Sequence, residues 1–265
     1  MKNRKLAMVS LAIGAFAFVM TGCGGNKEAT TETAPAANAP AGKTVDAATA
    51  GEVTGSVKLD GAAPKMKGIS MAAEPACSKA RTAPATSEEV ITGDGGALAN
   101  VVVYVKGGLD GYSFPAPATP AKITQEGCQY HPHVVGLQVG QNLDVVNSDQ
   151  TTHNIHPVPM QNREWNESQP PGAAPIEKNF AREEIAIPVK CNVHPWMKAY
   201  MAVLSNPYFQ VTAKDGKFDL KSLPPGTYTV VAWHELYGSS EQTVTIGPKE
   251  SKAVTFTFKA TAAGD

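Results

Sequence analysis

Short runs of apolar and β-branched residues, separated by turn residues, recur along most of the chain. Residues 53–59 alternate apolar and polar positions, whereas residues 101–105 form a continuous Val-rich run, which is typical of a strand buried on both faces. Pro-rich stretches at 114–120 and 169–175 are expected to be loops, because proline cannot donate to a sheet ladder. Many short strands with turn signals between them predict an all-β protein built from sandwiches or barrels.

A break at residues 205–207 divides the pattern into two parts. Before it, further strand-like runs occupy residues 134–139, 143–146, 185–189 and 199–204, and after it they occupy 209–213, 218–220, 228–233, 243–246 and 254–258. The later part has a hairpin turn signal at Asp215-Gly216 and the segment Leu223-Pro224-Pro225-Gly226 before a strand. These features resemble the carboxypeptidase regulatory-like β-sandwich family. The resemblance implies a fold for residues 206–260, and no enzymatic function carries over with it.

The N-terminus has the pattern of an export signal. Lys2, Arg4 and Lys5 precede an apolar run at residues 6–20, which is too short to span a bilayer comfortably. The run ends in Met20-Thr21-Gly22-Cys23, which resembles the lipobox of bacterial lipoproteins. The resemblance implies that residues 1–22 are a cleaved signal peptide and that the Cys23 thiol is lipidated, an ordinary secreted protein being the alternative.

Residues 23–50 lack any apolar period and are rich in Ala, Thr, Pro and Gly. Such a segment buries too little to fold, so it is expected to be a disordered tether between the lipid and the folded part. Gly24 directly after Cys23 favours the outer membrane under the enterobacterial sorting rule. We therefore expect an exported lipoprotein on the periplasmic face of a membrane or on the cell surface.

The net charge and the absence of two catalytic motifs exclude some classes of function. The formal net charge is −1, and no basic stripe indicates a nucleic-acid partner. The sequence contains neither HExxH nor a glycine-rich phosphate loop. We therefore expect a protein that is not an enzyme and has no nucleic-acid partner.

The chain has four cysteines, and each needs an assignment. Once Cys23 carries lipid, Cys77 and Cys128 are expected to form a disulfide, since exported proteins meet an oxidising compartment. Their alternative role is that of extra metal ligands. Cys191 is then left over, and an unpaired thiol in an exported protein requires a reason.

The segment Cys191-Asn192-Val193-His194-Pro195-Trp196-Met197 supplies that reason. It places a thiolate, an imidazole and a thioether within a short loop, and His153 is available after an earlier strand. Two His and one Cys with a weak axial Met are the ligands of a blue-copper site, which tolerates both Cu(I) and Cu(II). Zinc is disfavoured because zinc sites rarely use a thioether.

These two segments resemble the cupredoxins, most closely those of the amicyanin and plastocyanin type. The likeness extends over residues 123–204, with a long insertion between 156 and 185. It implies one type 1 copper ion bound equatorially by His153, Cys191 and His194 and axially by Met197. It also implies that Asn154 ties the two ligand loops together by hydrogen bonds. His194 would be the ligand nearest the surface, with Pro195 and Trp196 forming an apolar docking patch for redox partners.

Several other residues compete for these roles. Met201 is the rival axial ligand, although its alternation with residues 199 and 203 favours core packing. His131 and His133 could form a second metal site, but surface histidines before a strand are common. His156 is expected to lie at the surface or to contact a ligand residue, and His234 is expected to have a structural role.

The expected architecture is therefore a cupredoxin Greek-key β-sandwich at residues 51–205, followed by a second, smaller β-sandwich at 206–260. Residues 51–122 are assigned to the cupredoxin-like domain as flanking strands. The expected function is membrane-tethered periplasmic electron transfer between redox protein partners. The alternatives are a copper-binding or storage lipoprotein and a surface binding module without a redox role.

Overall fold

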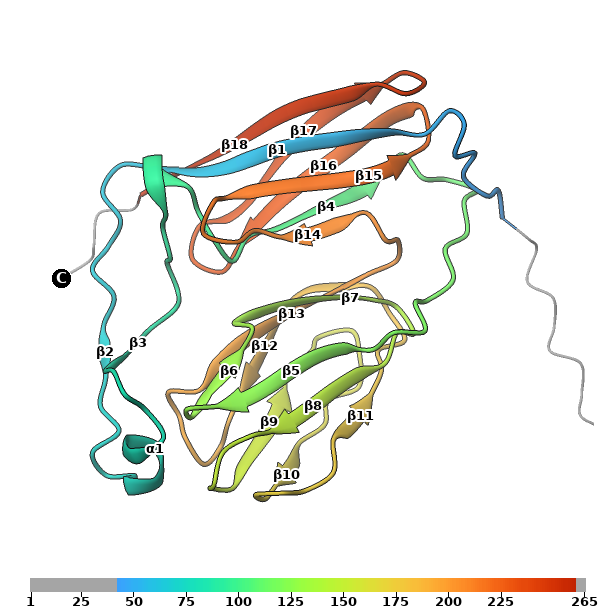
Figure 1. Cartoon of the computed structure of the whole chain (residues 1–265). Coiled ribbons are helices and arrows are strands. Elements are labelled where there is room, and N and C mark those ends of the chain that lie inside the picture. Colours follow the sequence, from blue (N-terminus) through green and yellow to red (C-terminus); the bar gives the residue numbers. More distant parts are fainter. Residues whose placement is uncertain (1–41, 261–265) are drawn as a thin grey trace, which may run out of the picture. The chain divides into compact units, whose positions relative to one another are not determined.

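A computed structural model describes residues 42–260 of the chain (Figure 1). The expected signal peptide and the lipidated Cys23 lie outside the described residues, as does most of the expected tether. Within the described part, helix is confined to α1 (Pro75–Lys79) and the short 3-10 helix η1 (Asp94–Gly96), and nearly all other regular structure is strand. This confirms the predicted all-β class. No helix in this part is long and apolar enough to cross a membrane.

The first sandwich is built from residues 121–204. One sheet has the strand order β10-β9-β12-β13-β7, and the facing sheet has the order β11-β8-β5-β6. Their bounds are β5 (Ala121–Glu126), β6 (Gln129–His131), β7 (Val134–Gln138), β8 (Leu143–Asn147), β9 (His153–Pro157), β10 (Glu167–Gln169), β11 (Ile176–Lys178), β12 (Glu184–Lys190) and β13 (Lys198–Leu204). The buried side chains between the sheets include Ile123, Leu137, Ile155 and Ile187. Alternating inward positions on these strands fill this core, as the strand period predicts.

The second sandwich combines strands from both ends of the described chain. Its sheets have the orders β15-β1-β18 and β14-β4-β16-β17. Their bounds are β1 (Gly51–Asp60), β4 (Val102–Gly107), β14 (Phe209–Val211), β15 (Lys217–Leu223), β16 (Gly226–His234), β17 (Gly238–Ile246) and β18 (Ser251–Lys259). The assignment of the early strands to the cupredoxin-like domain is wrong. All of β1 after its first residue pairs in parallel with β18, and β4 lies between β14 and β16.

The two sandwiches share a third cluster of buried residues. It contains Val102 and Tyr104 of β4, Val231 and Trp233 of β16, and Val134, Ala202 and Leu204 of the first sandwich. The alternate β4 residues Val103 and Val105 point the other way, into the core of the second sandwich. This explains the continuous apolar run at residues 101–105, because β4 is covered on both faces.

Residues 61–93, here called the strap, connect the two sandwiches. The strap leaves the end of β1, carries the small strands β2 (Gly68–Ile69) and β3 (Ala85–Thr86) and helix α1, and returns towards β4 (Figure 1). At its far end, Cys77 forms a disulfide with Cys128, in the turn between β5 and β6. Arg81 also donates to the carbonyl oxygen of Gly127 and to Oε1 of Gln129. The disulfide and these hydrogen bonds thus attach the strap to the end of the first sandwich where the candidate ligands lie.

Candidate metal centre

The pairing of β9 with β12 brings the two halves of the site together. These strands are antiparallel, with His156 opposite Lys190, so the start of β9 lies beside the residues that directly follow β12. His153 is the first residue of β9, and Cys191 directly follows β12. His194 and Met197 lie in the loop that leads to β13. The sheet therefore places His153 and His194, which are 41 residues apart in sequence, at one end of the first sandwich.

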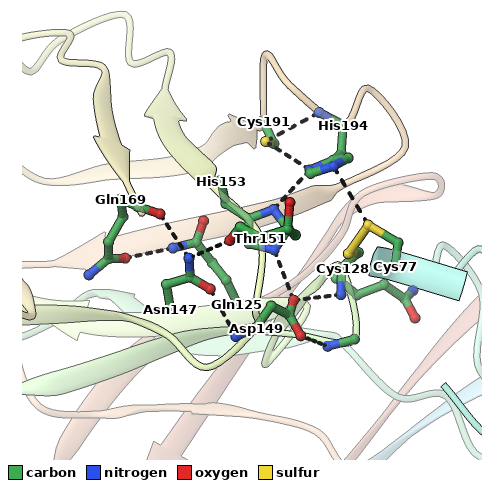
Figure 2. Close-up of polar contacts among 12 residues, drawn as sticks. Cys77, Gln125, Cys128, Asn147, Asp149, Thr151, His153, Gln169, Cys191 and His194 are labelled. Atoms are coloured by element: carbon green, nitrogen blue, oxygen red, sulfur yellow. Dashed lines mark hydrogen bonds and ion pairs between the residues drawn. A yellow bond between two sulfur atoms is a disulfide. The ribbon is translucent and has the colours of Figure 1, made fainter. Parts of the chain in front are cut away.

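Three of the predicted ligands point their metal-binding atoms towards one another (Figure 2). The Nδ1 atoms of His153 and His194 are 2.8 Å apart, and His194 Nδ1 lies 3.9 Å from the Cys191 sulfur. The ligand atoms of all three residues lie within 4.8 Å of one another, and all three side chains are buried. Two imidazoles and a thiol thus face a common point that a single ion could occupy.

Met197 lies at the end of the same loop. Its backbone N–H donates to the carbonyl oxygen of His194 at 2.9 Å, and its own carbonyl accepts from the Cys191 N–H at 3.3 Å. These bonds close the loop between its two ends. The Met197 side chain is fully buried in the core cluster that contains Cys191 and Met201. Burial does not separate Met197 from Met201, since both side chains have none of their surface exposed.

Asn154 connects the two ligand segments. Its Oδ1 accepts the backbone N–H of Asn192 at 2.6 Å and that of Val193 at 3.3 Å, and it also accepts the Cys191 thiol at 3.3 Å. Its Nδ2 donates to Asn166 Oδ1 at 2.6 Å, from the insertion between β9 and β12. The expected link between the loops is therefore present as direct hydrogen bonds.

The surroundings of Cys191 favour the thiolate. Burial raises the pKa of this thiol, but hydrogen bonding with His153 and from nearby backbone amides outweighs it and holds the pKa below its ordinary value. The His194 N–H, for example, donates to the sulfur at 3.4 Å. A thiolate is the form that binds a metal.

The outer nitrogen of His153, which is Nε2 and points away from the other candidate ligands, contacts an acidic residue that the sequence analysis did not identify. Asp149 Oδ2 lies 2.8 Å from His153 Nε2, and the same carboxylate accepts the backbone N–H groups of Gly127 and Cys128. Burial would raise the pKa of Asp149, but these hydrogen bonds hold it below its ordinary value. Burial lowers the pKa of His153, and the bonds to Asp149 and Cys191 outweigh it, so that this pKa is raised. The only sequence signal was an acidic residue four positions before the histidine.

The outer nitrogen of His194 faces the disulfide. Its Nε2 lies 3.6 Å from the Cys77 sulfur, and its ring centroid is 5.1 Å from that of Trp196. Only 1% of His194 is exposed, against 0% of His153 and 2% of Cys191, so exposure does not single out His194 as the ligand nearest the surface. The strap is the physical reason, because the disulfide and α1 cover this ring. Burial, followed by the positive charge of His153, lowers the pKa of His194 and favours the neutral imidazole that binds metals.

The residues of the expected docking patch differ in exposure. Pro195 is exposed, whereas Trp196 is partly buried and its Nε1 donates to the carbonyl oxygen of Cys128 at 3.1 Å. Trp196 lines a cavity of about 310 Å³ together with strap residues and Lys198. The Cys77–Cys128 disulfide predicted from the cysteine count is present, and Cys191 is the free cysteine of the described residues.

The remaining histidines have other partners. His133 forms an ion pair with Glu235 of the second sandwich. His156 binds Asn192 Oδ1 at 3.0 Å and Glu164 Oε1 at 2.6 Å. Within residues 42–260, the groups of three converging metal-binding side chains contain neither these histidines nor His131 or His234.

Comparison with known proteins found similarity to both expected families. A family model described as a carboxypeptidase regulatory-like domain matches residues 206–259. Among solved structures, an oxidised mutant of amicyanin is 12% identical, with 38% of this chain and 97% of that chain covered and a TM-score of 0.29. The purple cupredoxin from Nitrosopumilus maritimus is 22% identical, with 31% and 98% covered and a TM-score of 0.27. No curated protein sequence matches the chain.

A copper-containing nitrite reductase from Thermus scotoductus SA-01 is also similar, at 20% identity and a TM-score of 0.30 over 32% of this chain. This chain spans only 22% of the reductase. The match to the regulatory-like family covers the strands after the break at residues 205–207, as their motifs predict. The regulatory-like match begins at residue 206, and the structure adds β1 and β4 to complete that sandwich.

Proposed function

We propose that this chain is a membrane-tethered copper protein that passes single electrons between redox partners on the periplasmic face of a membrane. The observation that supports it best is the convergence of the two histidine Nδ1 atoms and the Cys191 sulfur in a buried site. Mixed nitrogen and thiolate donors suit copper in both oxidation states. A bound copper ion would supply reversible one-electron redox chemistry at this position.

The residues of the chain would hold the ion with little rearrangement. His153, Cys191 and His194 would hold the ion as its strong ligands, and Met197 would be its weaker fourth ligand. The hydrogen bonds of Asn154 fix the loop relative to β9, so that the donors stay in place when the charge of the ion changes. Burial of all three donors excludes water from the ligand positions. Such a preorganised and closed site suits electron transfer better than reversible copper storage.

The test is to load purified protein with Cu(II) and to record its visible spectrum and voltammogram. We expect an intense blue or purple charge-transfer band from the thiolate and a reversible one-electron wave, and we expect both to disappear in Cys191→Ser. Cys77→Ala/Cys128→Ala is the matched control, since it removes the other two described cysteine sulfurs and should keep the band. A colourless complex that does not cycle would refute electron transfer and favour a storage protein.

The membrane tether is a separate part of the proposal. It is supported by the lipobox-like segment that ends at Cys23. Cys23→Ser should release the protein from the membrane fraction into the soluble fraction, with its copper spectrum unchanged. Continued membrane association of this variant would refute lipidation at this cysteine.

A further inference from the structure

The carboxylate of Asp149 is buried and lies next to the outer nitrogen of His153. Only 6% of this residue is exposed, and both oxygens are used. Oδ1 accepts the Gly127 N–H at 2.7 Å, and Oδ2 accepts the Cys128 N–H at 2.8 Å and contacts His153 Nε2 at 2.8 Å. The Asp149 backbone N–H in turn donates to Asn147 Oδ1 at 3.0 Å. The side chain is therefore held in one orientation (Figure 2).

This contact determines which nitrogen of His153 carries the proton. A carboxylate with two amide donors is an acceptor, so Nε2 must be the donor in the bond to Asp149. Nδ1 of the neutral ring is then left with a free lone pair, and this is the atom that faces His194 Nδ1 and Cys191. The partner of the outer nitrogen thus selects the tautomer in which the ring can bind a metal.

The two candidate histidine ligands differ in the charge of the group that contacts their outer nitrogen. The outer nitrogen of His153 meets an ionised carboxylate, whereas that of His194 meets the uncharged Cys77 sulfur at 3.6 Å. A buried negative charge close to the ion stabilises the oxidation state with the larger positive charge more strongly. The effect on copper is therefore directional and favours Cu(II) over Cu(I).

We propose that Asp149 is a positioning residue for the copper site, which holds His153 in the Nε2–H tautomer and lowers the reduction potential. This inference rests on the proposed function. Partners of this kind typically contribute about 10–100-fold to metal affinity. If removing the charge weakens Cu(II) binding about tenfold more than Cu(I) binding, the potential rises by about 59 mV.

The test compares Asp149→Asn with Asp144→Asn. Both variants lose one negative charge with nearly the same shape, but Asp144 is the second residue of β8, pairs with Lys122 of β5, and forms no hydrogen bond with a candidate ligand among the described residues. Cu(II) and Cu(I) affinities are measured by competition with chelators, and the potential by spectroelectrochemistry. We expect Asp149→Asn to bind Cu(II) at least about tenfold more weakly, with a smaller loss for Cu(I) and a higher potential. Asp144→Asn should match the wild type.

Two results would overturn this proposal. Equal loss of Cu(I) and Cu(II) affinity at unchanged potential would leave Asp149 with a merely structural role. The tautomer can also be read in the wild-type apoprotein at alkaline pH by long-range ¹H–¹⁵N correlation, which does not depend on the variant folding. A proton on Nδ1 of His153 would refute the positioning role. A wild type that binds copper without colour or reversible redox would instead refute the proposed function.

Discussion

The Cys77–Cys128 disulfide should be a main source of stability, and its removal gives a measurable effect. It joins residues 51 positions apart, and the strap on one side of it has only two two-residue strands and one short helix of its own. Such a segment has few backbone contacts that would order it alone. Replacing both cysteines with alanine removes the cross-link without creating a free thiol.

The magnitude follows from loop closure. In the chain-entropy treatment, a cross-link that closes about 51 residues restricts the unfolded chain by about 4 kcal/mol at 25 °C. The native strap keeps part of its attachment in the variant, because Arg81 still donates to Gly127 and Gln129. The stability loss should therefore come mainly from the unfolded state, and the double variant should still fold.

The assay is urea unfolding of the copper-free protein, followed by circular dichroism and tryptophan fluorescence. The double variant and the chemically reduced wild type should agree, and both should be about 4 kcal/mol less stable than the oxidised wild type. Because Cys77 covers His194, copper should also be removed faster by a chelator once the disulfide is absent. A loss below about 1 kcal/mol in both forms would refute the loop-closure argument, and unchanged chelator kinetics would refute the covering role.

Other parts of the structure give further predictions. Burial, and then the positive charge of His133, lower the pKa of His234 to about 4. An unfolded histidine titrates near 6.5, so stability should fall by up to about 3 kcal/mol as the pH drops from about 6.5 to about 4. Urea unfolding across this range should show that slope, and His234→Gln should flatten it. Met197→Leu should shift the reduction potential and the visible spectrum of the copper form, whereas Met201→Leu should leave both unchanged. Each methionine variant should cost less than about 1.5 kcal/mol in urea unfolding, because side-chain volume is conserved. Burial raises the pKa of Glu184, but hydrogen bonds from three consecutive backbone amides outweigh it and hold the pKa below its ordinary value. Glu184→Gln should therefore cost about 1.5–3 kcal/mol at pH 7 in the same assay, and the difference from wild type should shrink as the pH falls through the folded pKa.

The features that could be predicted from the sequence are those that depend on residues close together in the chain. Four strands of the first sandwich, β7, β8, β12 and β13, follow from apolar runs and turn residues. The continuous run at 101–105 indicated a strand buried on both faces, as β4 is. The candidate ligands Cys191, His194 and Met197 lie within one short loop, so their spacing alone predicted that they act together. His153 could be added because its strand precedes that loop in a pattern known from cupredoxins.

The features that the sequence analysis missed depend on contacts between distant segments. The pairing of β1 with β18 joins the two ends of the described chain, and no local pattern distinguishes this partner from a strand of the first sandwich. The burial of His194 depends on the path of the strap, which brings Cys77 to a ring 117 residues away. Asp149 resembled an ordinary turn residue, because its role depends on the direction in which its side chain points.

His153 and His194 are both linked through their outer nitrogens to the same short turn, which contains Cys128. His153 is bonded through Asp149 to the backbone of Cys128, and His194 contacts the sulfur that is bonded to Cys128. The strap that brings Cys77 to this turn starts at the end of β1 and returns to β4, which both belong to the second sandwich. The second sandwich therefore anchors the segment that covers the ligands. Substitutions that loosen the strap should thus affect both histidines at once, whereas substitutions at Asn154 should act on the Cys191 loop.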